Sequence, residues 1–156
     1  MKYFEIDGFL PFYTEDGHDQ TCILLKNGDK EYSPYAIKHF IPHLLFDTGL
    51  DVRSTRLWAT KITGLKQNLP LVIDDQNIFI PIKFRKPLKS TTTAFGYINY
   101  TSIATYSDMR ITLNNQNILE TLSSAKYIDK KLIDAKLLAY AYLDTRKQYE
   151  FMWKSF

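Results

Sequence analysis

The chain has little of what secreted, membrane-spanning or disulfide-stapled proteins need. Its 156 residues include a single cysteine, Cys22, so an internal disulfide is excluded. No apolar stretch approaches the roughly 20 residues that cross a bilayer. The N-terminus carries Glu5 and Asp7 where a signal peptide would be hydrophobic. We therefore expect a cytoplasmic protein with no membrane partner.

Motifs for catalysis and cofactor binding are also missing. The sequence has no glycine-rich phosphate loop, no paired-cysteine motif and no nucleophile elbow. Cys22 lies in an apolar run, residues 22–25, which favours a buried hydrophobe over a reactive nucleophile. His39 and His43 have the spacing of metal ligands on a helix, but Pro42 is expected to break that helix. The sequence thus predicts no enzyme, no metal site and no cofactor.

Charge is sorted along the chain. Residues 1–52 hold four Lys and Arg against nine Asp and Glu, a net charge of −5. Residues 53–110 hold nine against three, a net charge of +6, and residues 111–156 hold seven against five, a net charge of +2. A basic block inside an otherwise balanced chain is typical of a surface that binds a polyanion, most often nucleic acid. The alternative is a solvated face with scattered lysines.

The length fits one domain, and the pattern predicts an α+β fold rich in antiparallel strands, with a central helical segment and a long C-terminal helix. We expect a single DNA-binding domain over residues 1–156. It divides into a β segment at 1–33, a helical segment at 34–64, a β segment at 69–122 and a helix at 124–147.

Short strands alternate with turn residues on both sides of the helical segment. Asn27-Gly28 predicts a type I′ hairpin turn, because both central residues of that turn need positive φ. The predicted strands are Tyr3–Ile6, Phe9–Tyr13, Thr21–Lys26, Lys30–Tyr32, Leu69–Ile73, Ile78–Ile82, Phe95–Tyr100, Ile103–Tyr106, Met109–Leu113 and Ile118–Leu122.

Capping residues mark the ends of the predicted helices. Ser33 and Pro34 indicate a short helix that ends near Phe40. A second helix is expected from Asp51 to Thr63, closed by Gly64, with Arg53, Arg56 and Thr60 on one face and Leu57, Trp58 and Ile62 toward the core. The third is expected from Ser124 to Lys147, capped by Ser123 or Ser124.

A basic loop at residues 83–93 has four cations and no acid. Such a loop suits the narrow minor groove of A·T-rich DNA, where the negative potential is deepest. Phe84 is either a wedge in that groove or a buried residue at the end of a strand, and burial is the favoured interpretation. We expect the loop to contact DNA and the preceding helix and turn to anchor phosphates, through Lys83, Arg85, Lys86 and Lys89, and through Arg53, Arg56, Lys61 and Lys66.

An ordered set of motifs resembles the competence transcription factor ComK family of Gram-positive bacteria. The set covers about residues 46–143. It comprises Ile62-Thr63-Gly64 followed by Leu69–Ile73, then Ile78-Phe79-Ile80-Pro81, Gly96–Tyr100, Arg110–Asn115 and the helix near Ser124–Leu143.

The resemblance implies an activator of DNA-uptake genes in the bacterial cytoplasm, associated with the nucleoid. It implies binding to A·T-rich double-stranded DNA by dimers or pairs of dimers. Glu150-Phe151-Met152-Trp153 is similar to the stretch through which an adaptor delivers the family's activator to a Clp-type protease. This assigns protein binding to Phe151, Met152 and Trp153.

A second class of function is a protein-binding adaptor or sequestering module with no DNA partner. The aromatic C-terminal segment and the acidic first third both suit that alternative.

Overall fold

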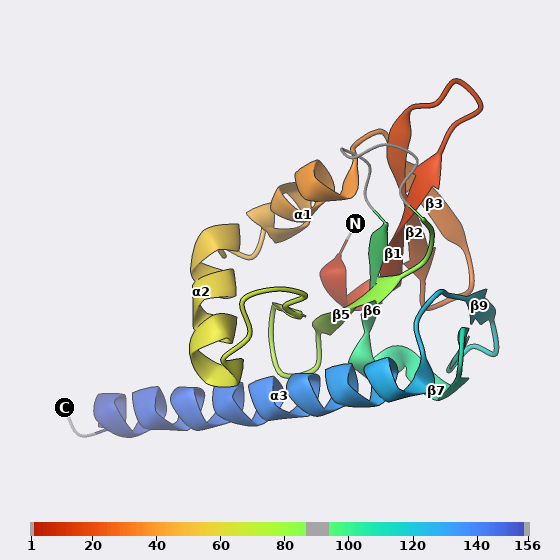
Figure 1. The fold of residues 1–156 in the computed structure, drawn as a ribbon. Helices are drawn as coiled ribbons and strands as arrows, with labels where there is room; N and C mark the ends of the chain where they lie inside the picture. Colours follow the sequence, from red (N-terminus) through yellow and green to blue (C-terminus); the bar gives the residue numbers. More distant parts are fainter. Residues whose placement is uncertain (1, 87–93, 155–156) are drawn as a thin grey trace.

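Six antiparallel strands form the main sheet. The computed structural model describes residues 2–86 and 94–154 (Figure 1). The strand order is β3-β2-β1-β6-β5-β4, so the N-terminal strands join the later ones through the β1–β6 pair. The strands are β1 (Ile6–Tyr13), β2 (Asp19–Leu25), β3 (Lys30–Ser33), β4 (Leu71–Val72), β5 (Ile78–Lys83) and β6 (Phe95–Asn99).

A small three-stranded sheet packs beside the main one. Its strands β7 (Ile103–Ser107), β8 (Arg110–Leu113) and β9 (Ile118–Glu120) pair in chain order and are antiparallel. Short 3-10 helices, η1 (Tyr3–Glu5) and η2 (Tyr100–Ser102), precede β1 and β7. The fold is α+β, as the sequence predicts.

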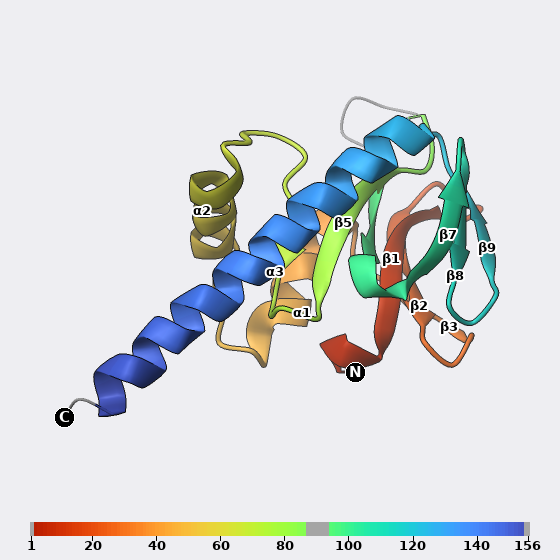
Figure 2. The same ribbon diagram turned by 90° about the horizontal axis from the view of Figure 1, so that it is seen from below.

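The main sheet is covered on both faces. On one face α1 (Ile37–Phe46) packs Phe40 and Leu44 against Phe9 and Phe79. On the other face lies α3 (Ala125–Lys154), which crosses the sheet in Figure 2. Successive side chains of a strand point to opposite faces. Three isoleucines of β5 accordingly lie with the α3 side of the core: Ile78, Ile80 and Ile82.

A helix at the margin of the sheet links the two layers. This helix, α2 (Val52–Thr63), contacts β4 and α3 and places Ala59 in the core. Its bounds follow from local signals, since Asp51 caps its start and Gly64, at φ 76°, ends it. The sequence prediction of this helix is confirmed.

The C-terminal helix is longer than predicted. Ser124 accepts a hydrogen bond from the Tyr127 amide at 3.1 Å and caps α3, as one of the two predicted alternatives has it. The helix continues to Lys154 rather than Lys147, because no glycine or proline follows Ser124 to stop it. At 30 residues it is about 45 Å long, and its C-terminal end projects past α2 (Figure 1).

Several predicted element bounds near the N-terminus are wrong. Residues 3–5 form η1 instead of a strand, and β1 runs unbroken through Gly8. Ser33 caps no helix, because it pairs with Thr21 as the last residue of β3. The first helix therefore starts at Ile37, and it continues through Pro42 instead of stopping there.

The hairpin at Asn27-Gly28 is present, but its turn is not type I′. Gly28 has φ 94°, whereas Asn27 is not among the non-glycine residues with positive φ. The Gly28 amide donates to Leu25 O, and the Leu25 amide donates to Asp29 O. This is the type I turn with a glycine bulge, in which glycine alone needs positive φ.

Candidate nucleic-acid interface

The outer face of α2 is basic. Asp51 Oδ2 accepts hydrogen bonds from the Ser54 amide at 3.0 Å and from the Ser54 hydroxyl at 3.1 Å, which fixes the start of the helix. Thr55 and Ala59 are buried, so the opposite face is left to solvent. The predicted phosphate anchors on this helix are all exposed: Arg53, Arg56 and Lys61.

One predicted core residue of α2 is wrong. Leu57 is 60% exposed and lies outside the core, whereas Trp58 and Ile62 do pack against it as predicted. Buried Thr55 replaces Leu57 on the inner face, because a residue four positions before Ala59 shares its face of the helix.

The cations at the end of β5 and directly after it have different environments. Lys83 is half-buried at the strand end, and Lys86 is exposed. Arg85 forms an ion pair with Asp19 at 2.9 Å and lies 4.3 Å from the centroid of the Tyr13 ring. Lys89 and the rest of the predicted loop over 87–93 lie outside the described residues.

Phe84, the residue between Lys83 and Arg85, packs against the core. It is half-buried, and a Cβ placed on Gly96 would lie 2.9 Å from its ring. The Phe84 ring therefore packs over Gly96 of β6. Lys66, in the segment after α2, is exposed.

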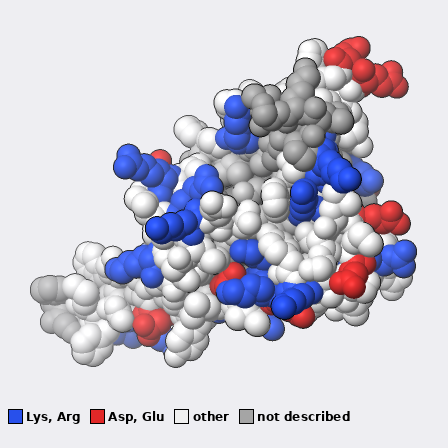
Figure 3. Space-filling view, viewed as in Figure 1, with Lys and Arg blue, Asp and Glu red and all other residues white. Residues whose placement is uncertain are grey.

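Lys and Arg side chains gather on one face of the protein. Figure 3 shows them over α2, along the N-terminal half of α3 and next to the grey residues. Acidic side chains lie mainly at the tip of the β1–β2 turn and at the edge near β9 in the same view. In the described residues no carboxylate is within salt-bridge distance of the α2 cations or of Lys66, Lys83 and Lys86.

Two exposed lysines near the start of α3 are missing from the predicted DNA-binding residues. Lys126 and Lys130 are exposed and lie four residues apart, on one side of the helix. Lys130 also pairs with Asp134 at 2.5 Å. The i, i+4 spacing of two lysines near the start of a predicted helix was the available signal.

A cluster of titratable groups lies beneath α3. The Tyr127 hydroxyl donates to Pro81 O at 2.8 Å, and burial raises the pKa of Tyr127 to about 12. Burial lowers the pKa of Lys131, which the adjacent Asp134 partly offsets. Lys131 Nζ donates to Asn68 O at 2.7 Å. The polar bonds of this cluster join parts of the chain to one another, which is a structural role.

Tyr97, on β6, also has a raised pKa because it is buried, and the positive charge of Arg56 opposes the shift. Arg56 itself is exposed.

No metal site is evident in the described part of the chain. Among residues 2–86 and 94–154 no group of three or more His, Cys, Asp or Glu could hold a metal ion. His39 and His43 do share one helix, because α1 continues through Pro42, so the expected break between them is wrong. The His43 ring stacks on Tyr35, with ring centroids 4.3 Å apart. Cys22 is buried, as predicted, and burial raises the pKa of its thiol.

The predicted protein-binding residues lie at the end of α3. Phe151, Met152 and Trp153 are all exposed, with Trp153 at 79%. They lie within α3, which continues past the predicted end at Lys147. None of the helices in the described residues is long and apolar enough to cross a membrane.

The fold is α+β, and exposed Lys and Arg side chains gather on the face seen in Figure 3, which we call the basic face. No protein-family model, curated protein or solved structure matches the chain.

Proposed function

We propose that the protein binds double-stranded DNA through its basic face and regulates transcription. The observation that carries this proposal is the gathering of exposed Lys and Arg over α2 and the N-terminal half of α3 (Figure 3). Side chains on a rigid helix can meet several phosphates at once and displace their counterions. In the described residues the α2 cations have no carboxylate partner, so no ion pair has to break before they contact phosphates.

We further propose that the preferred DNA is A·T-rich and is bound in the minor groove. The preference for A·T-rich DNA is supported by the resemblance to the ComK family and by the basic segment that follows β5. On the same ground we propose that the protein activates DNA-uptake genes as a dimer or a pair of dimers. The α2 cations then act as phosphate anchors, and the segment around Lys86 approaches the groove.

Fluorescence anisotropy with A·T-rich and G·C-rich duplexes at two salt concentrations tests the proposal. We expect tighter binding to the A·T-rich duplex and a steep loss of affinity with salt. The double variant Arg53→Gln/Arg56→Gln is expected to flatten the plot of log K against log[salt] by about 0.9 for each phosphate that the variant no longer neutralises.

The matched control is Lys30→Gln. Lys30 is exposed on β3, at the opposite edge of the main sheet from β4, which α2 contacts. The substitution removes one positive charge far from the proposed interface, so its salt slope is expected to equal that of the unsubstituted protein. Negligible binding to both duplexes would overturn the proposal.

A second candidate function is protein binding, supported by the exposed aromatic end of α3. Aromatic residues and methionine are enriched at protein interfaces. Phe151, Met152 and Trp153 present such a surface, and a Clp-type protease adaptor is the partner that the resemblance implies. A complex that survives nuclease treatment and is absent in Trp153→Ala supports this candidate.

A further inference from the structure

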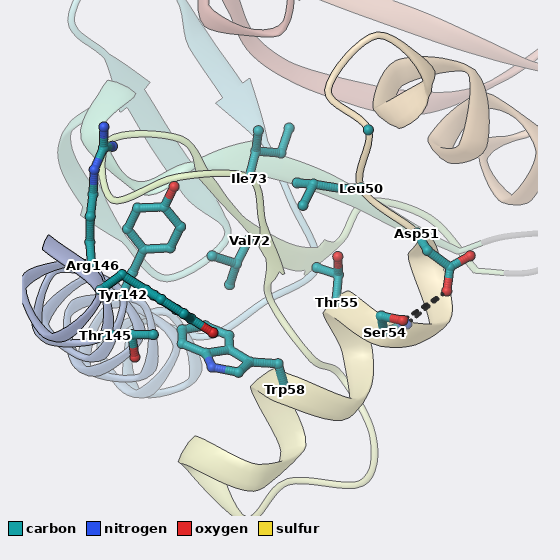
Figure 4. Close-up of a pocket in the computed structure, with 12 residues that line it drawn as sticks. Leu50, Asp51, Ser54, Thr55, Trp58, Val72, Ile73, Tyr142, Thr145 and Arg146 are labelled. Carbon is teal, nitrogen blue, oxygen red and sulfur yellow. Dashed lines mark hydrogen bonds between the residues drawn. The ribbon is translucent and has the colours of Figure 1, made fainter. Parts of the chain in front are cut away.

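A cavity of about 560 Å³ lies between α2, β4 and the C-terminal half of α3. This volume is in the range of small-molecule sites. Figure 4 shows side chains from all three elements facing it, with Trp58 on one wall, Tyr142 on another, and Val72 and Ile73 behind. The cavity is separate from the exposed cations of α2, which lie on the outer face of that helix.

The walls favour an apolar, planar ligand. Val72 and Ile73 are buried, and Leu50 closes the side opposite α3. Trp58, Tyr142 and Tyr149 add three aromatic side chains, and aromatic pairs attract one another beyond the area that they bury. A flat aromatic ring is therefore the ligand body that these walls fit best.

The polar groups of the cavity favour an anion. Arg146, at the α3 wall, is exposed, and in the described residues no carboxylate is within salt-bridge distance of it. The guanidinium has five N–H donors in a planar fork that matches a carboxylate. Asp51 lies at the opposite wall (Figure 4), where its carboxylate already accepts two hydrogen bonds from Ser54. Of the two charged side chains that line the cavity, Arg146 is therefore the one whose N–H donors are not used by any described residue.

We propose that this cavity binds a small aromatic carboxylate. The ring lies against Trp58 and Tyr142, and the carboxylate pairs with Arg146. Binding needs neither DNA nor an oligomer, so this proposal stands apart from the proposed function.

Isothermal titration calorimetry with 2-naphthoate and with the uncharged 2-naphthalenemethanol tests it. The unsubstituted protein is expected to bind 2-naphthoate more tightly. Arg146→Gln should weaken 2-naphthoate binding about tenfold, as expected for the removal of a charged hydrogen bond, and leave 2-naphthalenemethanol binding unchanged. The matched control is Lys147→Gln, which removes the neighbouring cation; Lys147 does not line the cavity.

A third variant locates the ligand. Thr145→Phe places a ring in the cavity from α3 and is expected to abolish binding of both compounds, with circular dichroism confirming the fold. Leu50→Trp narrows the same cavity from the loop before α2 and replaces Thr145→Phe if that variant does not fold.

Three results would overturn the proposal. One is no binding of 2-naphthoate at millimolar concentration. Another is an equal decrease in 2-naphthoate affinity for Arg146→Gln and Lys147→Gln, which would show that the net charge of the protein, and not Arg146, attracts the ligand. The third comes from sedimentation velocity: a dimer that Thr145→Phe converts to a monomer shows that a second copy of the chain fills the cavity.

Discussion

Arg85 and Asp19 form an ion pair of 2.9 Å that joins the end of β5 to the start of β2. Their side chains are only 20% and 19% exposed. One of the predicted DNA-binding cations is thus partly neutralised by a carboxylate from the acidic first third. Lys86, the next residue, is exposed.

The first prediction assigns different roles to Arg85 and Lys86. Lys86→Ala should lower DNA affinity and flatten the salt slope by about 0.9, with little effect on folding. Arg85→Ala should lower the free energy of unfolding by about 1–2 kcal/mol, with a smaller change of slope. Urea unfolding and anisotropy titrations on the same samples measure both quantities. Equal salt slopes for Lys86→Ala and Arg85→Ala would contradict the different roles assigned to these two residues.

The second prediction concerns Gly8, which faces the backbone of β6. A Cβ at Gly8 would lie 2.5 Å from Tyr97 O and 2.6 Å from Ile98 Cδ1. The carbonyl belongs to a strand and cannot move without disturbing the β1–β6 pair. Gly8→Ala should therefore cost about 2–3 kcal/mol of unfolding free energy or more.

Gly17→Ala serves as the comparison for Gly8→Ala. A Cβ at Gly17 meets no atom within 4 Å, although its φ of 81° adds strain. We expect a decrease of about 1 kcal/mol there. A decrease at Gly8 no larger than at Gly17 would show that the sheet accommodates the extra methyl group.

The third prediction concerns the buried pair Lys131 and Asp134, which are 4% and 2% exposed. Removing the carboxylate leaves a buried ammonium without its counter-charge. Asp134→Ala should therefore lower the free energy of unfolding by about 3–5 kcal/mol. The exposed Asp144→Ala on the same helix should change it by less than about 0.5 kcal/mol.

A double variant, Lys131→Met/Asp134→Leu, checks this cause. An apolar pair of similar volume removes both buried charges, so much of the stability should return. Denaturant unfolding of the single and double variants gives the comparison. A double variant as unstable as Asp134→Ala would mean that packing, and not charge, dominates at this site.

The fourth prediction is a pH dependence. The folded protein keeps the Tyr127 proton until its raised pKa of about 12, whereas the unfolded chain loses it near 10.0. The contribution of Tyr127 to stability is therefore complete below pH 10 and is lost as pH rises from 10 toward 12. Tyr127→Phe lacks the hydrogen bond to Pro81 O and should be about 1 kcal/mol less stable at pH 8.

The difference between the unsubstituted protein and Tyr127→Phe should shrink as pH rises above 10. Urea unfolding at pH 8, 10 and 11 measures it. Tyr140→Phe, which removes an exposed hydroxyl on the same helix, is the control. A difference that stays constant over this range would contradict the prediction.

Much of the fold followed from local patterns. The bounds of α2 were predictable because the capping residue Asp51 and the terminating Gly64 lie directly next to the helix in the sequence. The strand predicted at Leu69–Ile73 shrinks to Leu71–Val72, and Pro70 has no amide to donate to a ladder. Pro42 lies inside α1, whose Phe40 and Leu44 are buried against the sheet. The continuation of α1 through Pro42 depends on such partners, which are distant in the sequence.

For the candidate site, too, only the features that depend on neighbouring residues could be predicted from the sequence. The basic block and the outer cations of α2 could be read from the sequence, because charge and helical spacing are local properties. The pairing of Arg85 with Asp19, the lysines of α3 on the basic face and the cavity beside Trp58 could not. Each of these joins residues from different elements.

The order of residues by itself determined the α+β class, the capped helix and the sorting of charge, since each depends on neighbours along the chain. Only the tertiary structure decided which cations keep a free charge and which face they share. The reason is that Arg85 meets a carboxylate 66 residues away, and such contacts arise from packing.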